Sequence, residues 1–408
     1  MSNTPKIRFD GFTGDWEQRK LNTIADVRDG THASPQYFST GHPFITSKNV
    51  KDGYINYDDV QYISDEDFEE INKRSKVDVN DILMGMIGTI GNLALIREIP
   101  DFAIKNVALI KDTGAIFYLY LYHCLQSETV INQLSENMDG GTQKFVALKS
   151  IRELNIAFPS KPEQEKIGTF FSNLDTLITL QQRKCATLQK FKKSMLQKMF
   201  PQNGESVPEI RFNGFTDSWE QRKLGDMGET YTGLSGKTKE DFGHGNAKFV
   251  TYMNVFSNSI ADLSMTESVE IDKKQNEVNY GDVFFTTSSE TPDEVGMSSV
   301  WLENSDNTYL NSFCFGYRPS VKVNPYYMAY MLRSDNVRKN IVFLAQGISR
   351  YNISKNKMME ISVSLPNLEE QQKIGEYFRN LDTLITLHQR KLETLQKMKK
   401  ALLQKMFV

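Results

Sequence analysis

Residue types that commonly do chemistry are sparse in this chain and lie far apart. The five histidines (His32, His42, His123, His244 and His388) lack metal-ligand spacing, and neither an HExxH motif nor a phosphate-binding GxxxxGK[ST] loop occurs. Pro100-Asp101 and Pro292-Asp293 resemble the start of an acidic nuclease motif. Neither is followed in its half of the chain by the Asp/Glu-x-Lys that completes a metal-and-lysine site. Nuclease chemistry within this chain is therefore not expected.

Two other segments resemble parts of an adenine methyltransferase. Asn324-Pro-Tyr-Tyr327 approaches the Asn-Pro-Pro-Tyr motif that grips a flipped adenine, but it lacks the second proline. Asn-Pro is also a common helix start signal. Phe242-Gly-His-Gly245 is similar to a methyl-donor glycine loop, yet the glycine spacing differs and no apolar strand precedes it. We interpret both as accidental, and expect no catalytic residue, cofactor or metal site in this chain.

The bulk composition favours a globular protein of two or three domains. The chain has 408 residues, its longest apolar-aromatic run (Ala115–Tyr122) is too short to span a bilayer, and its start has no apolar stretch resembling a signal peptide. Its three cysteines are widely scattered, so neither a disulfide frame nor a cysteine zinc site is indicated. We expect a cytoplasmic protein without membrane contact.

The charge is unevenly distributed. The formal net charge is −3, but residues 161–200 carry +5 and residues 367–408 carry +3, which leaves −11 for the remainder. Such a protein cannot hold a polyanion by its global charge. If it binds DNA, it uses a local basic face, and a partner supplies much of the phosphate contact. The alternative is that these lysines only solvate helix surfaces.

The most informative feature is an internal duplication. Residues 7–21 (IRFDGFTGDWEQRKL) return at 210–224 with 12 of 15 positions identical, and residues 166–184 return at 373–391 with 15 of 19 identical. Between these copies the two halves barely agree. A duplicated frame around unlike inserts predicts a pseudo-twofold molecule with two different recognition surfaces.

The second repeat predicts two long helices, each about 60 Å long at 1.5 Å per residue. Ser160 and Asn367 each lie three positions before a glutamate, which is the capping-box spacing. Apolar residues then recur every three or four positions, interrupted by Gln181 and His388, as in a coiled-coil seam. We expect the two helices to pair antiparallel, with an ordinary homodimeric coiled coil as the alternative. The expected helix-pair interface consists of Leu174, Leu177, Leu188, Phe191, Met195, Leu381, Leu384, Leu395, Met398 and Leu402, with Met199 and Met406 continuing the two stripes.

The inserts read as mixed α/β domains, because β-branched and aromatic alternation is followed by matched helices and a glycine-containing turn. The fold class is therefore α+β: two globular mixed α/β domains in a pseudo-twofold arrangement, joined by two long helices that form an antiparallel coiled coil. The expected boundaries are 1–159 for the first domain with its repeated segment 7–21, 160–200 for the first long helix, 201–209 for a linker, 210–366 for the second domain and 367–408 for the second long helix.

With these features together, the chain resembles the specificity subunit of type I restriction–modification systems over essentially its whole length. The resemblance is carried by WEQRKL at 16–21 and 219–224, by NLDTLITL at 173–180 and 380–387, and by PEQEKIG at 162–168 with its counterpart at 368–375. Each motif is weak alone, but the duplicated set in this order is specific. The segments from Asp29 (DGTHASPQYF) and at 87–91 (IGTIG) also resemble one common type of target recognition domain.

The resemblance implies a non-catalytic reader of double-stranded DNA. Two target recognition domains would each read one half of a bipartite, asymmetric site, and the helix pair would fix the gap between the halves. Two methyltransferase subunits and, in the restriction complex, motor–nuclease subunits would be its partners. S-adenosylmethionine, ATP and Mg would belong to those partners.

Base readout requires polar and basic side chains at base edges. The expected DNA-binding residues of the first domain are Thr31, His32, Ser47, Lys48, Asn49, Thr142, Gln143 and Lys144. Those of the second are Lys237, Tyr252, Asn254, Ser349, Arg350 and Tyr351. The alternative is that Asn49 and Asn254 only close turns and that Tyr351 belongs to the core.

Two functions of other classes stay open at this point: a self-contained DNA methyltransferase, and a coiled-coil interaction scaffold without DNA binding. The leading interpretation carries a mechanical hypothesis. Adding one helical turn to the helix pair, about 5.4 Å, should lengthen the preferred DNA spacer by about 1–2 bp.

Overall fold

The computed structural model describes residues 4–142, 144–202 and 204–407, and the chain divides into two compact units. Unit 1 comprises residues 1–182 and 390–408, and unit 2 comprises residues 183–389. This division falls within both long helices. Each unit therefore contains the beginning of one long helix and the end of the other.

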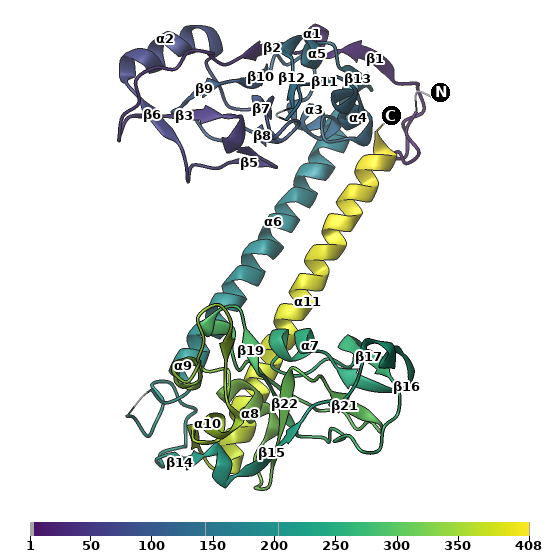
Figure 1. The fold of residues 1–408 in the computed structure, drawn as a ribbon. Coiled ribbons are helices and arrows are strands. Elements are labelled where there is room, and N and C mark those ends of the chain that lie inside the picture. The colour runs from purple at the N-terminus through teal and green to yellow at the C-terminus, as the bar shows by residue number, and fades with distance from the viewer. Residues whose placement is uncertain (1–3, 143, 203, 408) are drawn as a thin grey trace. The chain divides into compact units, whose positions relative to one another are not determined.

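Unit 1 is built on a four-stranded antiparallel sheet in the order β2 (Asp26–Asp29), β10 (Val107–Lys111), β7 (Ile82–Gly85) and β8 (Leu93–Leu95) (Figure 1). Its central strands are continuous apolar runs because both faces are covered. Ile82, Met84 and Ile110 enter one core, and Leu83 and Leu109 enter another. A second sheet has the order β6 (Gln61–Ile63), β3 (His42–Thr46) and β9 (Ala103–Lys105), with β3 and β9 parallel.

The remaining elements of unit 1 are two-stranded ribbons and helices. The two-stranded ribbons are β1 (Glu17–Lys20) with β13 (Asn155–Phe158), β4 (Val50–Lys51) with β5 (Tyr54–Ile55), and β11 (Met138–Asp139) with β12 (Phe145–Val146). The helices are α1 (Leu21–Ile24), η1 (Ser47–Asn49), α2 (Asp65–Ser75), α3 (Tyr118–Cys124), α4 (Glu128–Glu136), α5 (Leu148–Arg152) and the long α6 (Lys161–Lys198).

Unit 2 repeats the strand order of the two larger sheets. Its four-stranded sheet has the order β15 (Gly228–Thr232), β22 (Cys314–Pro319), β18 (Val283–Thr286) and β20 (Ser298–Val300), and its three-stranded sheet has the order β17 (Thr266–Val269), β16 (Phe242–Val250) and β21 (Thr308–Leu310). The ribbons are β14 (Glu220–Lys223) with β24 (Ser362–Leu365), and β19 (Ser288–Ser289) with β23 (Tyr351–Asn352). The helices are η2 (Leu224–Asp226), η3 (Lys239–Asp241), α7 (Tyr252–Ser257), η4 (Leu263–Met265), η5 (Pro292–Glu294), α8 (Pro325–Met331), α9 (Asp335–Phe343), α10 (Lys355–Met359) and the long α11 (Leu368–Met406). The prediction of two mixed α/β domains that share a fold is confirmed.

The duplicated sequence segments form the frame of each unit. In unit 1 the guanidinium of Arg8 forms a bidentate ion pair with the buried carboxylate of Glu163. Its Nε and Nη2 lie 2.6 and 2.8 Å from the two carboxylate oxygens. Arg211 and Glu370 repeat this pair in unit 2 at 2.7 and 2.8 Å. The glutamates of the expected capping boxes thus bind arginines from the first repeat. Of the two expected caps, Asn367 accepts the Glu370 amide through its side chain, at 2.9 Å.

The repeated KIG motif brings helices close together. A Cβ on Gly168 would lie 2.6 Å from the Tyr120 backbone nitrogen, and one on Gly375 would lie 2.9 Å from that of Tyr327. The absence of a side chain lets α6 approach α3, and α11 approach α8. The tyrosine hydroxyls then donate to backbone carbonyl groups of β13 and β24.

The long helices pair antiparallel in each unit, as predicted. In unit 1 the rings of Phe171 and Phe407 lie 5.6 Å apart, and Asp175 contacts Lys399. Residue numbers along α11 therefore decrease as those along α6 increase, so the two helices run in opposite directions. In unit 2, Phe378 lies 5.9 Å from Phe200, and Asp382 pairs with Lys192. The last turn of each helix is thus built into the core of a domain.

The expected interface residues divide into three groups. Leu174 and Leu381 are buried, whereas Leu188, Met195, Leu395 and Leu402 are half-buried. Leu177, Phe191, Leu384 and Met398 are exposed and lie outside the buried stripe. The stripe runs instead through positions such as Cys185 and Ile385, which are buried. Within the described ranges, none of the helices has the length and apolar character that crossing a bilayer requires.

Candidate nucleic-acid interface

The glycine turn of the first domain is the tip of the β11–β12 hairpin. The side chains of Thr142 and Lys144 are exposed, and Gln143 lies outside the described residues. The Gly88 amide donates to the Lys144 carbonyl over 3.3 Å. The hairpin therefore lies against the IGTIG loop, so two segments singled out in the sequence are adjacent.

Ser47 connects a second loop to the segment that begins the IGTIG loop. Its buried hydroxyl donates to the Asn106 carbonyl over 2.6 Å and accepts from the backbone amides of Met86 and Ile87, at 3.0 and 3.3 Å. These bonds use both the donor and the acceptor capacity of the hydroxyl. Ser47 thus positions the neighbouring loop rather than offering a free polar group.

Asn49 closes the turn that presents Lys48. It is buried, its Oδ1 accepts from the Thr46 amide over 3.0 Å, and its Nδ2 donates to the carbonyls of Asn56 and Asp59. Lys48 is exposed on this turn and pairs with the Asp59 carboxylate at 2.7 Å, which lowers the pKa of that carboxyl group. Of the expected 47–49 triplet, only Lys48 presents a side chain outward.

Thr31 and His32 both contact Asn106, whose carbonyl also accepts from Ser47. Asn106 was not among the residues expected from the sequence. The His32 ring lies 2.6 Å from Asn106 Oδ1 and 2.9 Å from Asp29 Oδ2. The Asn106 amide donates to the Thr31 carbonyl, and Asn106 adopts a φ of +51°. Asparagine tolerates this left-handed conformation better than most residues. An asparagine directly before an apolar strand was the only sequence signal for it.

The matching hairpin of the second domain is a tight turn. A Cβ on Gly347, whose φ is +149°, would overlap the Arg350 carbonyl oxygen, so the turn requires glycine. Ser349 and Arg350 are exposed at its tip, and the half-buried Tyr351 pairs with Ser289 of β19.

Tyr252 lies beside this hairpin, but Asn254 and Lys237 have other roles. The Tyr252 hydroxyl donates to the Ser288 carbonyl over 2.7 Å; burial raises its pKa and the charge of Arg350 opposes the rise. Asn254 is buried and donates to the Asp262 and Met265 carbonyls, so it closes a turn as Asn49 does. Lys237 pairs with Asp272 at 3.0 Å, and that hydrogen bond raises the pKa of the lysine.

The segment that resembled an adenine-gripping motif is a helix start. Asn324 caps α8 by accepting the Tyr327 amide over 3.0 Å, and the Tyr327 side chain is fully buried. Among the described residues, no cluster of three or more His, Cys, Asp or Glu side chains could hold a metal ion.

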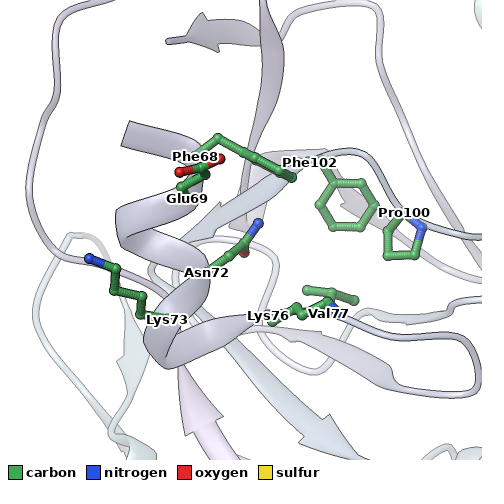
Figure 2. Close-up of a pocket in the computed structure, with 8 residues that line it drawn as sticks. All are labelled: Phe68, Glu69, Asn72, Lys73, Lys76, Val77, Pro100 and Phe102. Carbon is green, nitrogen blue, oxygen red and sulfur yellow. The ribbon is translucent and has the colours of Figure 1, made fainter. Parts of the chain in front are cut away.

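A separate hollow of about 330 Å³ lies in unit 1 beside α2. Figure 2 shows Pro100 and Phe102 facing α2 across it, and the buried Oδ1 of Asn72 lacks a hydrogen-bond partner. No residue expected to touch DNA lines this hollow. Its lining consists of Phe68, Glu69, Asn72, Lys73, Lys76, Val77, Pro100 and Phe102.

Comparison with known proteins identifies the family. The family model of the type I restriction modification DNA specificity domain matches the chain twice, at residues 13–190 and 216–397. The chain therefore belongs to the type I restriction modification DNA specificity domain family. The two matches coincide with the duplication seen in the sequence.

Relatives and solved structures agree with this assignment. The chain is 23% identical to a putative type I restriction enzyme MjaX specificity subunit of Methanocaldococcus jannaschii, over 98% of this chain and 95% of that protein. It is 26% identical to the type I restriction enzyme EcoBI specificity subunit of Escherichia coli, over 48% of this chain and 44% of the relative. A type I restriction–modification S subunit from M. genitalium has a similar fold, with a TM-score of 0.61 at 14% identity and 99% coverage of both chains. A structure described as the basis of complex assembly and conformational transition of the type I R-M system gives 0.57 at 15% identity, covering 97% of this chain and 98% of that one.

Proposed function

We propose that this chain is the DNA-reading specificity subunit of a type I restriction–modification complex and performs no catalysis itself. It reads a bipartite, asymmetric site and directs adenine methylation and restriction by its partner subunits. The observation that carries the proposal is a duplicated frame that presents two unlike sets of exposed loop residues. Because the frame is duplicated, the chain contains two DNA-reading domains. Because their loops differ in sequence, the two domains read different half-sites.

The loops around the two hairpins are the proposed reading surfaces. In the first domain, Lys48, Thr142 and Lys144 are exposed on loops that two contacts hold to the same segment. The Ser47 hydroxyl accepts from the Met86 amide, and the Gly88 amide donates to the Lys144 carbonyl. Ser349 and Arg350 hold the matching place in the second domain. Hydrogen-bonded loops with exposed polar tips suit base and phosphate contacts, because their backbone has little conformational freedom left to lose on binding.

Partners are needed because the chain is acidic outside its long helices. Outside residues 161–200 and 367–408 the net charge is −11, which opposes binding to a polyanion. We propose that two methyltransferase subunits supply much of the phosphate contact, and that motor–nuclease subunits join in the restriction complex. S-adenosylmethionine, ATP and Mg act in those partners, in the cytoplasm.

We further propose that the helix pair sets the spacing of the two half-sites. Helices α6 and α11 contain 38 and 39 residues, so each is nearly 60 Å long. Two major-groove readers on one DNA face are separated by a helical turn or more, about 34 Å per turn. Rods of this length suit such a separation.

The test is to express the chain with its methyltransferase subunits and map the modified adenines by methylome sequencing. The expected result is one asymmetric bipartite motif with adenines modified in both halves. Methyl-donor binding by the isolated chain would instead support a self-contained methyltransferase. Failure of the complex to protect any DNA sequence from cleavage would support the scaffold function.

A further inference from the structure

The two reading surfaces carry opposite chemistry at matching backbone positions. Asn49 and Asn254 are both buried and both donate to two carbonyl groups of the loop that follows, so they mark the same point in the fold. The residue before each is outward-facing. It is Lys48 in the first domain and Met253 in the second, and each is 54% exposed.

A second pair precedes the matching central strands. Asn106 lies directly before β10, and Phe313 directly before β22. The Asn106 carbonyl accepts a hydrogen bond from Ser47, and the Phe313 carbonyl accepts two from Thr287, through its amide and its hydroxyl. The first domain thus has a half-buried amide here, whose Oδ1 lies 2.6 Å from the His32 ring, whereas the second has an aromatic residue that is 56% exposed.

A third pair lies at the hairpin tips. Gly141 follows Gly140 in the first turn, and Ile348 follows Gly347 in the second. The Ile348 side chain is 96% exposed. Neither the core nor the turn geometry needs an isoleucine there, because the neighbouring Gly347 already supplies the unusual backbone conformation.

Hydrogen bonds to Thr287 and Ser288 link the three segments that carry these apolar residues of the second domain. Thr287 contacts Phe313, and the adjacent Ser288 accepts from Tyr252, the neighbour of Met253. Ser288 also pairs with Asn352 of the hairpin that carries Ile348. Single exposed apolar side chains are common, but several on segments that are bonded to one another indicate an interaction site.

Among the base edges exposed in the major groove, the one apolar group is the C5 methyl group of thymine. We propose that Met253, Phe313 and Ile348 form an apolar reading surface that contacts thymine methyl groups in the half-site bound by the second domain. This inference rests on the proposed function. The nearby Arg350 is exposed and would contact a phosphate, which would hold the surface in the groove. The first domain, with Lys48 and Asn106 in these places, reads its half-site through polar contacts.

The experiment uses the complex of the full chain with its methyltransferase subunits. Once the site is mapped, thymines of either half-site are replaced by deoxyuridine on both strands, which removes only the methyl groups. Replacement in one half-site is expected to weaken binding about fourfold for each thymine methyl group that the surface buries, a factor derived from about 0.8 kcal/mol per buried methyl-sized group. Replacement in the other half-site is expected to have no effect.

A triple variant identifies the surface responsible. Met253→Lys, Phe313→Asn and Ile348→Gly install the residues of the first domain, and this variant should bind the thymine and deoxyuridine duplexes equally. Ile271→Ala, at an exposed apolar position elsewhere in the same domain, should retain the discrimination.

Equal binding of all duplexes by the unaltered complex would overturn the inference while leaving the proposed function intact. Loss of assembly with the methyltransferase in the triple variant would also overturn it, since the surface would then dock a protein. Absence of site-specific binding to the unmodified duplex would reject the proposed function itself.

Discussion

Lys399 Nζ lies 2.7 Å from Asp175 Oδ1, and this pair joins the end of α11 to α6 within unit 1. Lys192 and Asp382 repeat the pair in unit 2 at 2.5 Å. All four side chains are about one third exposed or less, so the charges are partly desolvated. The same lysine–aspartate contact forms once in each unit, because the two long helices are sequence copies that run antiparallel.

Replacing Lys399 by methionine should destabilise unit 1 by about 2 kcal/mol, between the values typical of exposed and buried ion pairs. The carboxylate of Asp175 would remain in a partly buried place without its cation. Chemical denaturation of the variant measures the loss. Lys73→Met, which breaks an exposed pair with Glu70, is the control and should leave stability nearly unchanged.

The loss in Lys399→Met should depend on pH. Burial raises the pKa of the Asp175 carboxyl and Lys399 opposes the rise, so the pKa rises further in the variant. A carboxyl group whose folded pKa exceeds its unfolded value costs stability as the pH increases from about 4 through the folded pKa. The pKa of His123, which lies 3.9 Å from Asp175, is lowered by burial and then by Lys399, so removing the lysine also makes its protonation easier. The deficit should therefore be larger at pH 8 than at pH 5, and equal deficits would contradict this account.

The Arg8–Glu163 pair should be among the costly contacts to break. Arg8→Ala leaves the buried Glu163 carboxylate unpaired and should cost about 3–5 kcal/mol, with Arg211→Ala having the same effect in unit 2. Arg8→Lys should restore only part of this, because an ammonium group cannot make the two-pronged contact. Hydrogen exchange resolved by residue would locate each destabilisation in its own unit. Lys223→Ala, which removes an exposed pair with Glu360, should leave stability nearly unchanged.

The hairpin tips should contribute to DNA affinity. Lys144→Ala and Arg350→Ala are each expected to weaken binding of the methyltransferase complex by about 1–3 kcal/mol. If the contact is to a phosphate, the slope of log affinity against log salt should fall by about one. Wild-type affinity in both variants would remove these turns from the proposed interface. Lys405→Ala, at an exposed helix position away from both hairpins, serves as the control.

Lengthening both long helices should change only the DNA spacer. Seven residues inserted between Gln182 and Arg183, and seven between Gln389 and Arg390, preserve the heptad pattern and fall at the boundary of the two compact units. Each insertion adds about 10.5 Å, which corresponds to about 3 bp of DNA. Methylome sequencing should show both half-sites unchanged and a spacer longer by that amount. An unaltered spacer would show that the helices do not set the distance.

The sequence by itself determined the duplicated frame, because repeats and apolar periodicity are local properties that can be counted along a chain. It predicted the antiparallel helices, the matched domains and the glycine turns. It also placed Lys144 and Arg350 in the hairpin turns, where both side chains prove to be exposed. The buried stripe between the two long helices was predicted less well. Leu177 was expected in it and is exposed, whereas Cys185 was not expected and is buried. Which face of a helix contacts its partner depends on the exact packing.

Only the tertiary structure decided which polar residues are already occupied. Ser47, Asn49 and Asn254 suit base readout by type, but each is buried and hydrogen-bonded to backbone groups. Those groups are distant in the chain for Ser47 and lie in the same turn for the two asparagines. The converse holds for Met253, Phe313 and Ile348. By residue type they belong in a core, and the fold instead exposes them around Thr287 and Ser288. Whether a side chain faces the core or the solvent depends on contacts between remote segments, and a linear sequence does not record those contacts.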